Sequence, residues 1–122
     1  MKKLLLLLIT VSLFTVSCSK EEVAKQATTQ SYTIQINGNE EFESITIQVK
    51  DKYANILETR TVTYQQYYTY STNQGEQVDI TVKDEDSFSG TYVITNTTTM
   101  NTFTNTFNGN RNLVIHKLLY QI

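Results

Sequence analysis

Side chains suited to catalysis are scarce in this sequence. It contains one histidine, His116, and one cysteine, Cys18, which are too few for a zinc site, a disulfide framework or a cysteine–histidine pair. A Ser-His-Asp triad has no support beyond that single histidine. His116 shares parity with Val114, Leu118 and Tyr120, so we expect it to point toward the more apolar face of the last strand. The sequence therefore predicts no enzyme, no cofactor and no metal site.

The sequence contains two acidic segments, and one of them could attract a hard cation. Asp84-Glu85-Asp86 places carboxylates close together, but the fifth position of that run is Phe88, and no acidic residue closes the loop as calcium loops require. Residues 40–43 form the second acidic segment. We interpret residues 84–86 as a solvated turn, with a weak calcium site as the alternative, and residues 40–43 as the charged shoulder of a hairpin.

Tyrosines are the strongest binding feature. Tyr64, Tyr67, Tyr68 and Tyr70 lie close together, and each offers a flat apolar ring with a polar tip, which suits sugar stacking and protein contacts. On strand parity, Tyr64, Tyr68 and Tyr70 pack inward and only Tyr67 faces out. A kink at Gln65-Gln66 would instead reset the parity and expose part of the cluster.

A threonine- and asparagine-rich stretch follows, from Asn96 through Thr97-Thr98-Thr99 to Asn112. It carries many uncharged hydrogen-bonding groups, which sugar recognition uses. Exposed strand faces and turns use the same groups, and that is the interpretation we favour.

The elements that must position these side chains are strands. Apolar residues alternate with polar ones over residues 31–37, 45–49, 60–72, 78–82 and 88–94, and Gly, Asn or acidic clusters separate the runs. Residues 103–107 and 113–122 continue the series. The pattern predicts seven to eight strands and an all-β domain, a single antiparallel β-sandwich, over residues 31–122.

The charge composition argues against one class of binding partner. The whole chain carries 10 basic and 12 acidic residues, with a formal charge of −2, and shows no basic stripe. Nucleic acid, whose phosphates demand such a stripe, is therefore not an expected partner.

The N-terminal residues have the pattern of an export signal. Lys2 and Lys3 precede an uncharged apolar run over residues 4–16, which is too short to span a bilayer as a helix. The segment Phe14-Thr15-Val16-Ser17-Cys18 resembles the lipobox of bacterial lipoproteins. The resemblance implies that residues 1–17 are removed and that Cys18 is acylated, which would anchor the chain in the outer membrane. Cleavage by an ordinary signal peptidase is the alternative.

We interpret residues 18–30 as the acylated cysteine followed by a flexible tether. Ser19, Lys20, Glu21 and Glu22 resemble the lysine-plus-acidic export signal that sends some lipoproteins to the cell surface. The segment could equally be a solvated spacer.

The strand layout resembles small immunoglobulin-like sandwich domains of bacterial envelopes, a likeness that implies a fold and not a function. We expect a surface-facing lipoprotein whose domain is a non-catalytic binding or structural module. The alternatives are an assembly subunit that pairs by strand addition through residues 113–122, and a glycan-binding module.

Overall fold

The computed structural model describes residues 30–122, which form one open, four-stranded antiparallel sheet. The strands are β1 (Tyr32–Lys50), β2 (Ile56–Thr72), β3 (Gln77–Asn96) and β4 (Thr102–Leu118), followed by the single 3₁₀ turn η1 (Leu119–Gln121). Their order in the sheet is β2-β1-β3-β4. Alternating β-branched residues explain why these segments are strands, since such side chains fit a pleated surface.

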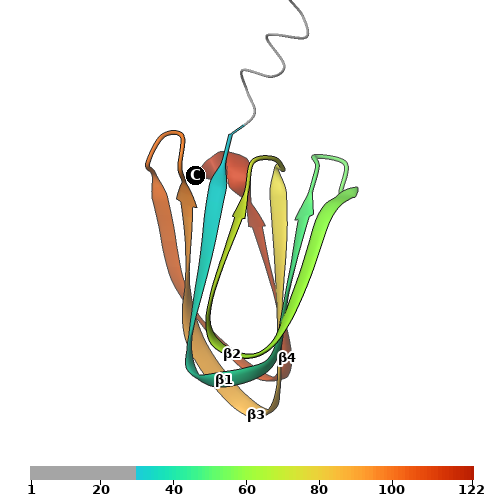
Figure 1. The fold of residues 1–122 in the computed structure, drawn as a ribbon, viewed down its shortest axis with the longest axis vertical. Coiled ribbons are helices and arrows are strands. Elements are labelled where there is room, and N and C mark those ends of the chain that lie inside the picture. The colour runs from blue at the N-terminus through green and yellow to red at the C-terminus, as the bar shows by residue number, and fades with distance from the viewer. Residues whose placement is uncertain (1–29) are drawn as a thin grey trace, which may run out of the picture.

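Each strand bends near its middle, so the sheet folds over on itself (Figure 1). One half, which we call the first arm, comprises residues 32–38, 67–72, 87–96 and 102–110; the second arm comprises residues 44–50, 56–65, 77–83 and 112–118. All the bends lie at the end opposite the point where the chain enters the domain. Strand pairing continues with the same neighbours on both sides of each bend.

The expectation of seven to eight strands in a two-sheet sandwich is not confirmed. The structure has four long strands in one sheet, and several of the turn signals in the sequence lie at bends within strands rather than at hairpins between them. Asn37-Gly38-Asn39 leads into the bend of β1, Asp84-Glu85-Asp86 lies in that of β3, and Asn108-Gly109-Asn110 comes directly before that of β4. The all-β prediction itself is confirmed.

The bend of β1 contains a bulge that changes which residues point inward. Between two register positions β1 advances from Asn37 to Phe42, while β2 recedes only from Tyr67 to Gln65. The inward residues are therefore Ile34 and Ile36 before the bulge, and the odd-numbered Ile45, Ile47 and Val49 after it. A bulge of this kind lets both arms present apolar side chains to the same interior.

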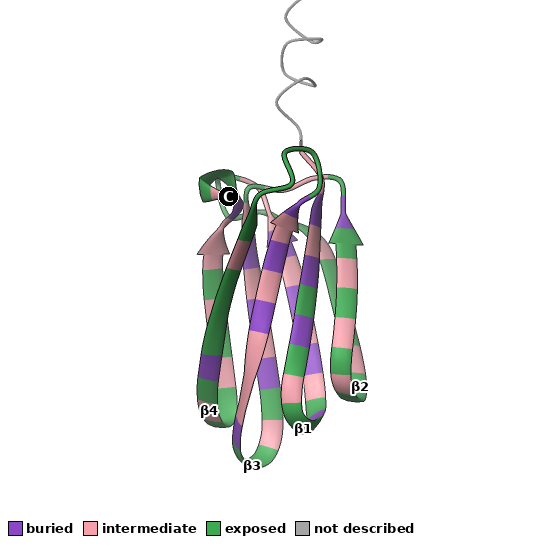
Figure 2. Cartoon of the chain, turned by 90° about the vertical axis from the view of Figure 1, so that its left-hand side faces the viewer, coloured by how far each residue is buried: buried purple, intermediate pink, exposed green. Residues whose placement is uncertain are grey.

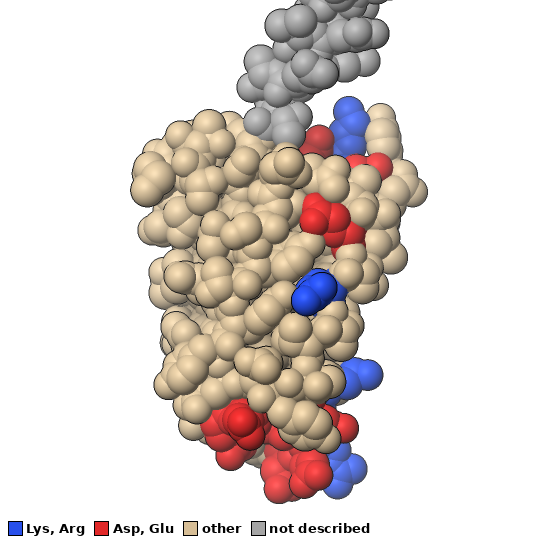
Figure 3. Space-filling model, viewed as in Figure 1, with Lys and Arg blue, Asp and Glu red and all other residues tan. Residues whose placement is uncertain are grey.

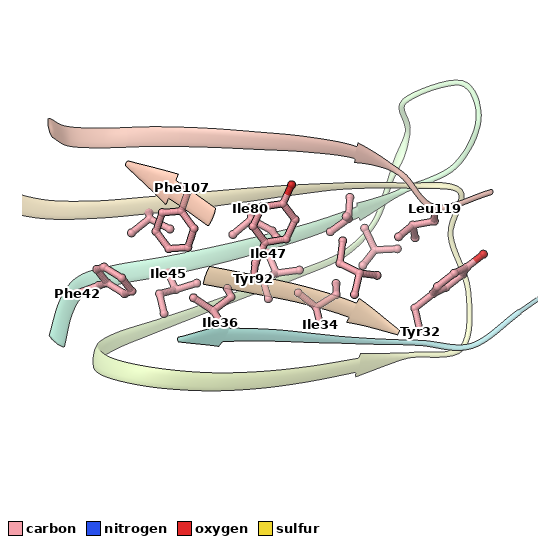
Figure 4. Close-up of a cluster of buried hydrophobic side chains, with 14 of the residues drawn as sticks. Tyr32, Ile34, Ile36, Phe42, Ile45, Ile47, Ile80, Tyr92, Phe107 and Leu119 are labelled. Carbon is pink, nitrogen blue, oxygen red and sulfur yellow. The ribbon is translucent and has the colours of Figure 1, made fainter. Parts of the chain in front are cut away.

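The hydrophobic core fills the space between the two arms (Figure 4). Ile34 and Ile36 of the first arm and Ile47 and Ile80 of the second are all fully buried, and Leu119 of η1 covers one end. The alternation of burial along β1 and β3 is visible in Figure 2, which looks onto the first arm. Burial of this kind stabilises a domain by about 25 cal/mol per Å² of apolar surface removed from water.

Three phenylalanines fill the interior of the bends. The ring of Phe42 lies 5.6 Å from that of Phe88 and 5.9 Å from that of Phe107, centroid to centroid. Two of these rings cover glycines on the neighbouring strand: Gly90 pairs with Phe107, and Gly109 pairs with Phe88. A Cβ atom at Gly109 would lie 2.4 Å from the Phe88 ring, so only glycine permits this approach. Aromatic rings packed over strand glycines are a recurrent way to curve a sheet.

In each of the outer strands β2 and β4, side chains of the half in the first arm contact side chains of the half in the second arm. On β2, Glu58 of the second arm accepts hydrogen bonds from Tyr70 and Thr72 of the first. On β4, the Lys117 ammonium lies 3.9 Å from the centre of the Phe103 ring, a cation–π contact.

Candidate functional site

The predicted signal at residues 1–17, the lipidated Cys18 and the export residues Ser19, Lys20, Glu21 and Glu22 all lie outside the described residues. The structure does describe the start of the domain, from residue 30. Asn96, which is buried, donates from Nδ2 to Oε1 of Gln30 at 2.5 Å, and the backbone N–H of Thr97 donates to the Ser31 carbonyl at 2.9 Å. The loop between β3 and β4 thus holds the first residues of the domain in place.

The tyrosine cluster is divided by the bend of β2. Tyr64 adopts a left-handed conformation (φ 54°) and is 68% exposed, and Tyr67 is 63% exposed. Tyr68 and Tyr70 are half-buried against the core. The prediction that Tyr64 packs inward is wrong because the backbone turns at this residue, whereas the alternative of a kink that exposes part of the cluster agrees with the structure.

Among the described residues, Glu58 is the carboxylate that accepts hydrogen bonds from the largest number of other side chains, three. Oε1 accepts a hydrogen bond from the Tyr70 hydroxyl at 2.5 Å, and Oε2 accepts from the Thr72 hydroxyl and from Nε2 of Gln74, the latter at 3.0 Å. Burial alone would raise the pKa of the Glu58 carboxyl, but the hydrogen bonds from Thr72, Tyr70 and Gln74 outweigh it and hold the pKa below its usual range. Burial, and then the Glu58 carboxylate, raise the pKa of Tyr70 to about 12. The group is therefore a carboxylate that accepts from a neutral phenol at neutral pH.

Glu58 also borders a shallow depression of about 570 Å³ at the end where the chain enters the domain. Its walls carry hydroxyl and amide groups together with this one carboxylate; they are Ser31, Tyr32, Thr33, Glu58, Ser71, Thr72, Asn73 and Thr97. Such a lining suits a polar, hydroxyl-bearing ligand.

We expect stability to fall in acid partly through Glu58. Its folded pKa lies below the unfolded value, so its contribution is complete above the unfolded pKa and is lost as pH falls through the folded pKa. Denaturant unfolding at pH 7 and pH 3 should show that the free energy of unfolding falls less for Glu58→Gln than for wild type. Some pH dependence should remain in the variant, because Asp51 and Asp79, whose pKa values are also lowered, still titrate. A pH dependence equal to that of wild type would contradict this role for Glu58.

His116 lies on the outer face of the second arm, with its side chain 52% exposed. The prediction that it points to the more apolar face is wrong, because Leu113 and Ile115 supply the inward side of β4. Its Nδ1 lies 2.5 Å from Oδ1 of Asp79, whose Oδ2 accepts from Lys50 Nζ at 2.6 Å. Burial would raise the pKa of Asp79, but the hydrogen bonds from Lys50 and His116 lower it overall. This row links β1, β3 and β4 and has the character of a structural ion pair.

The two acidic segments come together at the bends. Residues 40–43 lie in the bend of β1 and residues 84–86 in that of β3, and these strands are neighbours. Figure 3 shows carboxylates gathered at this end of the molecule. Among residues 30–122, no group of three or more His, Cys, Asp or Glu side chains is arranged to hold a metal ion.

The outer face of the first arm is polar and uncharged. Paired residues in a sheet point to the same side, so the register defines this surface, which we call the threonine face. Its three cross-strand rows, in the order β2, β1, β3, β4, are Ser71–Thr33–Thr95–Thr102, Thr69–Gln35–Val93–Thr104 and Tyr67–Asn37–Thr91–Thr106, and Ser89–Asn108 extends it toward the bends. Within the described chain no member of this face is charged, and most carry a hydroxyl group.

Sequence reasoning missed Glu58 and found only the β4 part of the threonine face, within the threonine- and asparagine-rich stretch. The alternation of Thr102, Thr104 and Thr106 is a visible signal for a uniform outer face. Glu58 had no such signal, because its partners Tyr70 and Thr72 reach it only when β2 folds over.

No helix in the described part of the chain has the length and apolar character needed to cross a bilayer. Comparisons with protein-family models, with curated proteins and with solved structures each find no match. The arrangement of residues described above therefore carries the functional argument.

Proposed function

We propose that this chain is a lipid-anchored protein of the bacterial outer membrane, displayed at the cell surface, whose all-β domain is a non-catalytic binding or structural module. The anchor is Cys18, and residues 19–30 separate it from the domain. A finer likeness to immunoglobulin-like sandwiches belongs to the same proposal, supported by two arms that face each other across an apolar interior.

The observation that carries the proposal is where the chain enters the domain. Residue 30 lies at one end of the folded sheet and all the bends lie at the other (Figure 1). An anchor attached at the entry end would place the bends farthest from the bilayer and leave both outer faces accessible from the sides. The domain is thus suited to presenting broad polar surfaces to the surroundings.

Replacing Cys18 by alanine tests the anchor. We expect Cys18→Ala to lose labelling by a palmitate analogue and to leave the membrane fraction, because a multiply acylated cysteine binds membranes firmly. Ser17→Ala, which keeps a small residue before the cysteine, is the matched control and should label normally. Protease added to intact cells then reports which side of the outer membrane carries the domain. Full labelling of Cys18→Ala would refute the lipoprotein assignment.

A second candidate is an assembly subunit that pairs by strand addition. It is favoured by β2 and β4, since each forms an outer edge of the described sheet. The expected route through residues 113–122 needs correction, because β4 ends at Leu118 and Leu119 is buried in η1. Co-purification of a stoichiometric envelope protein that is lost on substituting proline for Thr61 in β2 would favour assembly over ligand binding.

A further inference from the structure

We propose that the threonine face binds a neutral, extended polysaccharide. The inference rests on the binding role proposed above and names its surface and ligand class. Three features of the described residues carry it: the charge distribution, the spacing of the hydroxyl groups, and the depression at the end of the face.

Charge separates the two outer faces of the folded sheet. The corresponding face of the second arm carries Lys50, Asp79, Lys83 and His116, and the bends carry carboxylates. The threonine face has no charged member, although Lys, Arg, Asp and Glu are 18% of the chain. Figure 3 shows the same contrast in profile: above the bends, the left-hand side, where the first arm lies, is uncharged. A neutral occupant therefore buries no unpaired charge on docking here, whereas an ionic one leaves its charge unpaired.

Spacing favours a ligand with regularly repeated hydroxyl groups. Neighbouring strands lie about 4.8 Å apart and alternate residues along a strand about 6.6 Å apart, so the side chains form a two-dimensional array of donors and acceptors. The four strands lie side by side in Figure 2, with β4 and β2 at the margins. At the β2 margin Tyr67, which is exposed, offers a ring against which a sugar can stack.

The depression marks one end of the proposed binding path. Thr33 and Ser71 belong both to the threonine face and to the walls of the depression, and their hydroxyls lie 3.3 Å apart. Glu58 adds a carboxylate there that can accept a further hydrogen bond from a sugar hydroxyl. A surface array that leads into a polar hollow suits a chain ligand more than a second flat protein face.

The test uses the full chain, solubilised in detergent, and three insoluble probes: cellulose and chitin, which are uncharged, and calcium alginate, which is anionic. Thr104→Lys places a charge on the threonine face, and Thr59→Lys places one on the outer face of the second arm. Both positions are exposed threonines on outer strands, so the two variants are matched.

We expect wild type to be retained on cellulose or chitin and not on alginate. Thr104→Lys should bind at least about tenfold more weakly, because a charge is buried unpaired under the ligand, while Thr59→Lys binds like wild type. Tyr67→Ala should also weaken retention. Failure of wild type to bind either neutral polymer, equal loss in the two lysine variants, or concentration-dependent dimerisation abolished by Thr104→Lys would overturn the proposal. Cys18 labelling is measured separately, so the anchor assignment stands or falls independently.

Discussion

Phe42→Ala should lower the free energy of unfolding by about 3–5 kcal/mol, the usual cost of removing a fully buried aromatic ring. Phe42 is wholly buried and touches both other phenylalanines of the bends. Its loss leaves a cavity between the bends of β1, β3 and β4, the three strands that carry these phenylalanines. For a domain of this size that is a large share of the total stability.

Tyr67→Ala is the control for that measurement. It removes a similar ring from the outer surface of the same region, so its melting temperature should stay near that of wild type. Thermal melts followed by circular dichroism compare the two variants. Near-equal melting temperatures for Phe42→Ala and wild type would show that the bends do not depend on the phenylalanine cluster.

Gly90→Ala should also be strongly destabilising, by about 1–3 kcal/mol through overpacking. An added Cβ would lie 2.5 Å from the Asn37 carbonyl oxygen and 2.6 Å from the Phe107 ring. The first contact is with backbone of the neighbouring strand, which cannot move without breaking the pairing of β1 with β3. The added methyl group should therefore open the bend of the sheet.

Ser89→Ala, one residue earlier on the outer face, is the matched comparison and should change stability by less than about 0.5 kcal/mol. Urea unfolding gives both free energies. A Gly90→Ala protein as stable as wild type would mean that the strands approach each other less closely than the structure indicates.

Local sequence pattern predicted the strands well and their number poorly. Ile34, Ile36, Val78 and Ile80 point inward as alternation requires, and all are buried. A glycine–asparagine cluster, however, has the same composition whether a strand ends there or bends there. The difference is set by long-range pairing, because β1 meets β3 on both sides of its bend.

At the candidate site, too, local pattern predicted some features, and long-range packing determined the others. Exposure of Tyr67 followed from parity, whereas exposure of Tyr64 depended on a left-handed backbone that no local pattern requires. His116 was misplaced because both parities of the last strand carry apolar residues, and packing of an outer strand decides between them. Glu58 could not be found from sequence, since its partner Thr72 is on the other arm of the same strand.

The strand order also limits the sequence in which the strands can pair during folding. β1 lies between β2 and β3, so the β1–β2 hairpin can form from local contacts, but β1 stays half-covered until β3 is available. Pairing of Tyr32 with Asn96 closes most of the domain into one loop, and such high contact order is typical of proteins that fold in roughly milliseconds to seconds. During that interval the apolar residues of β1 are open to solvent. The unfolded chain therefore exposes this apolar surface to aggregation until its last two strands dock.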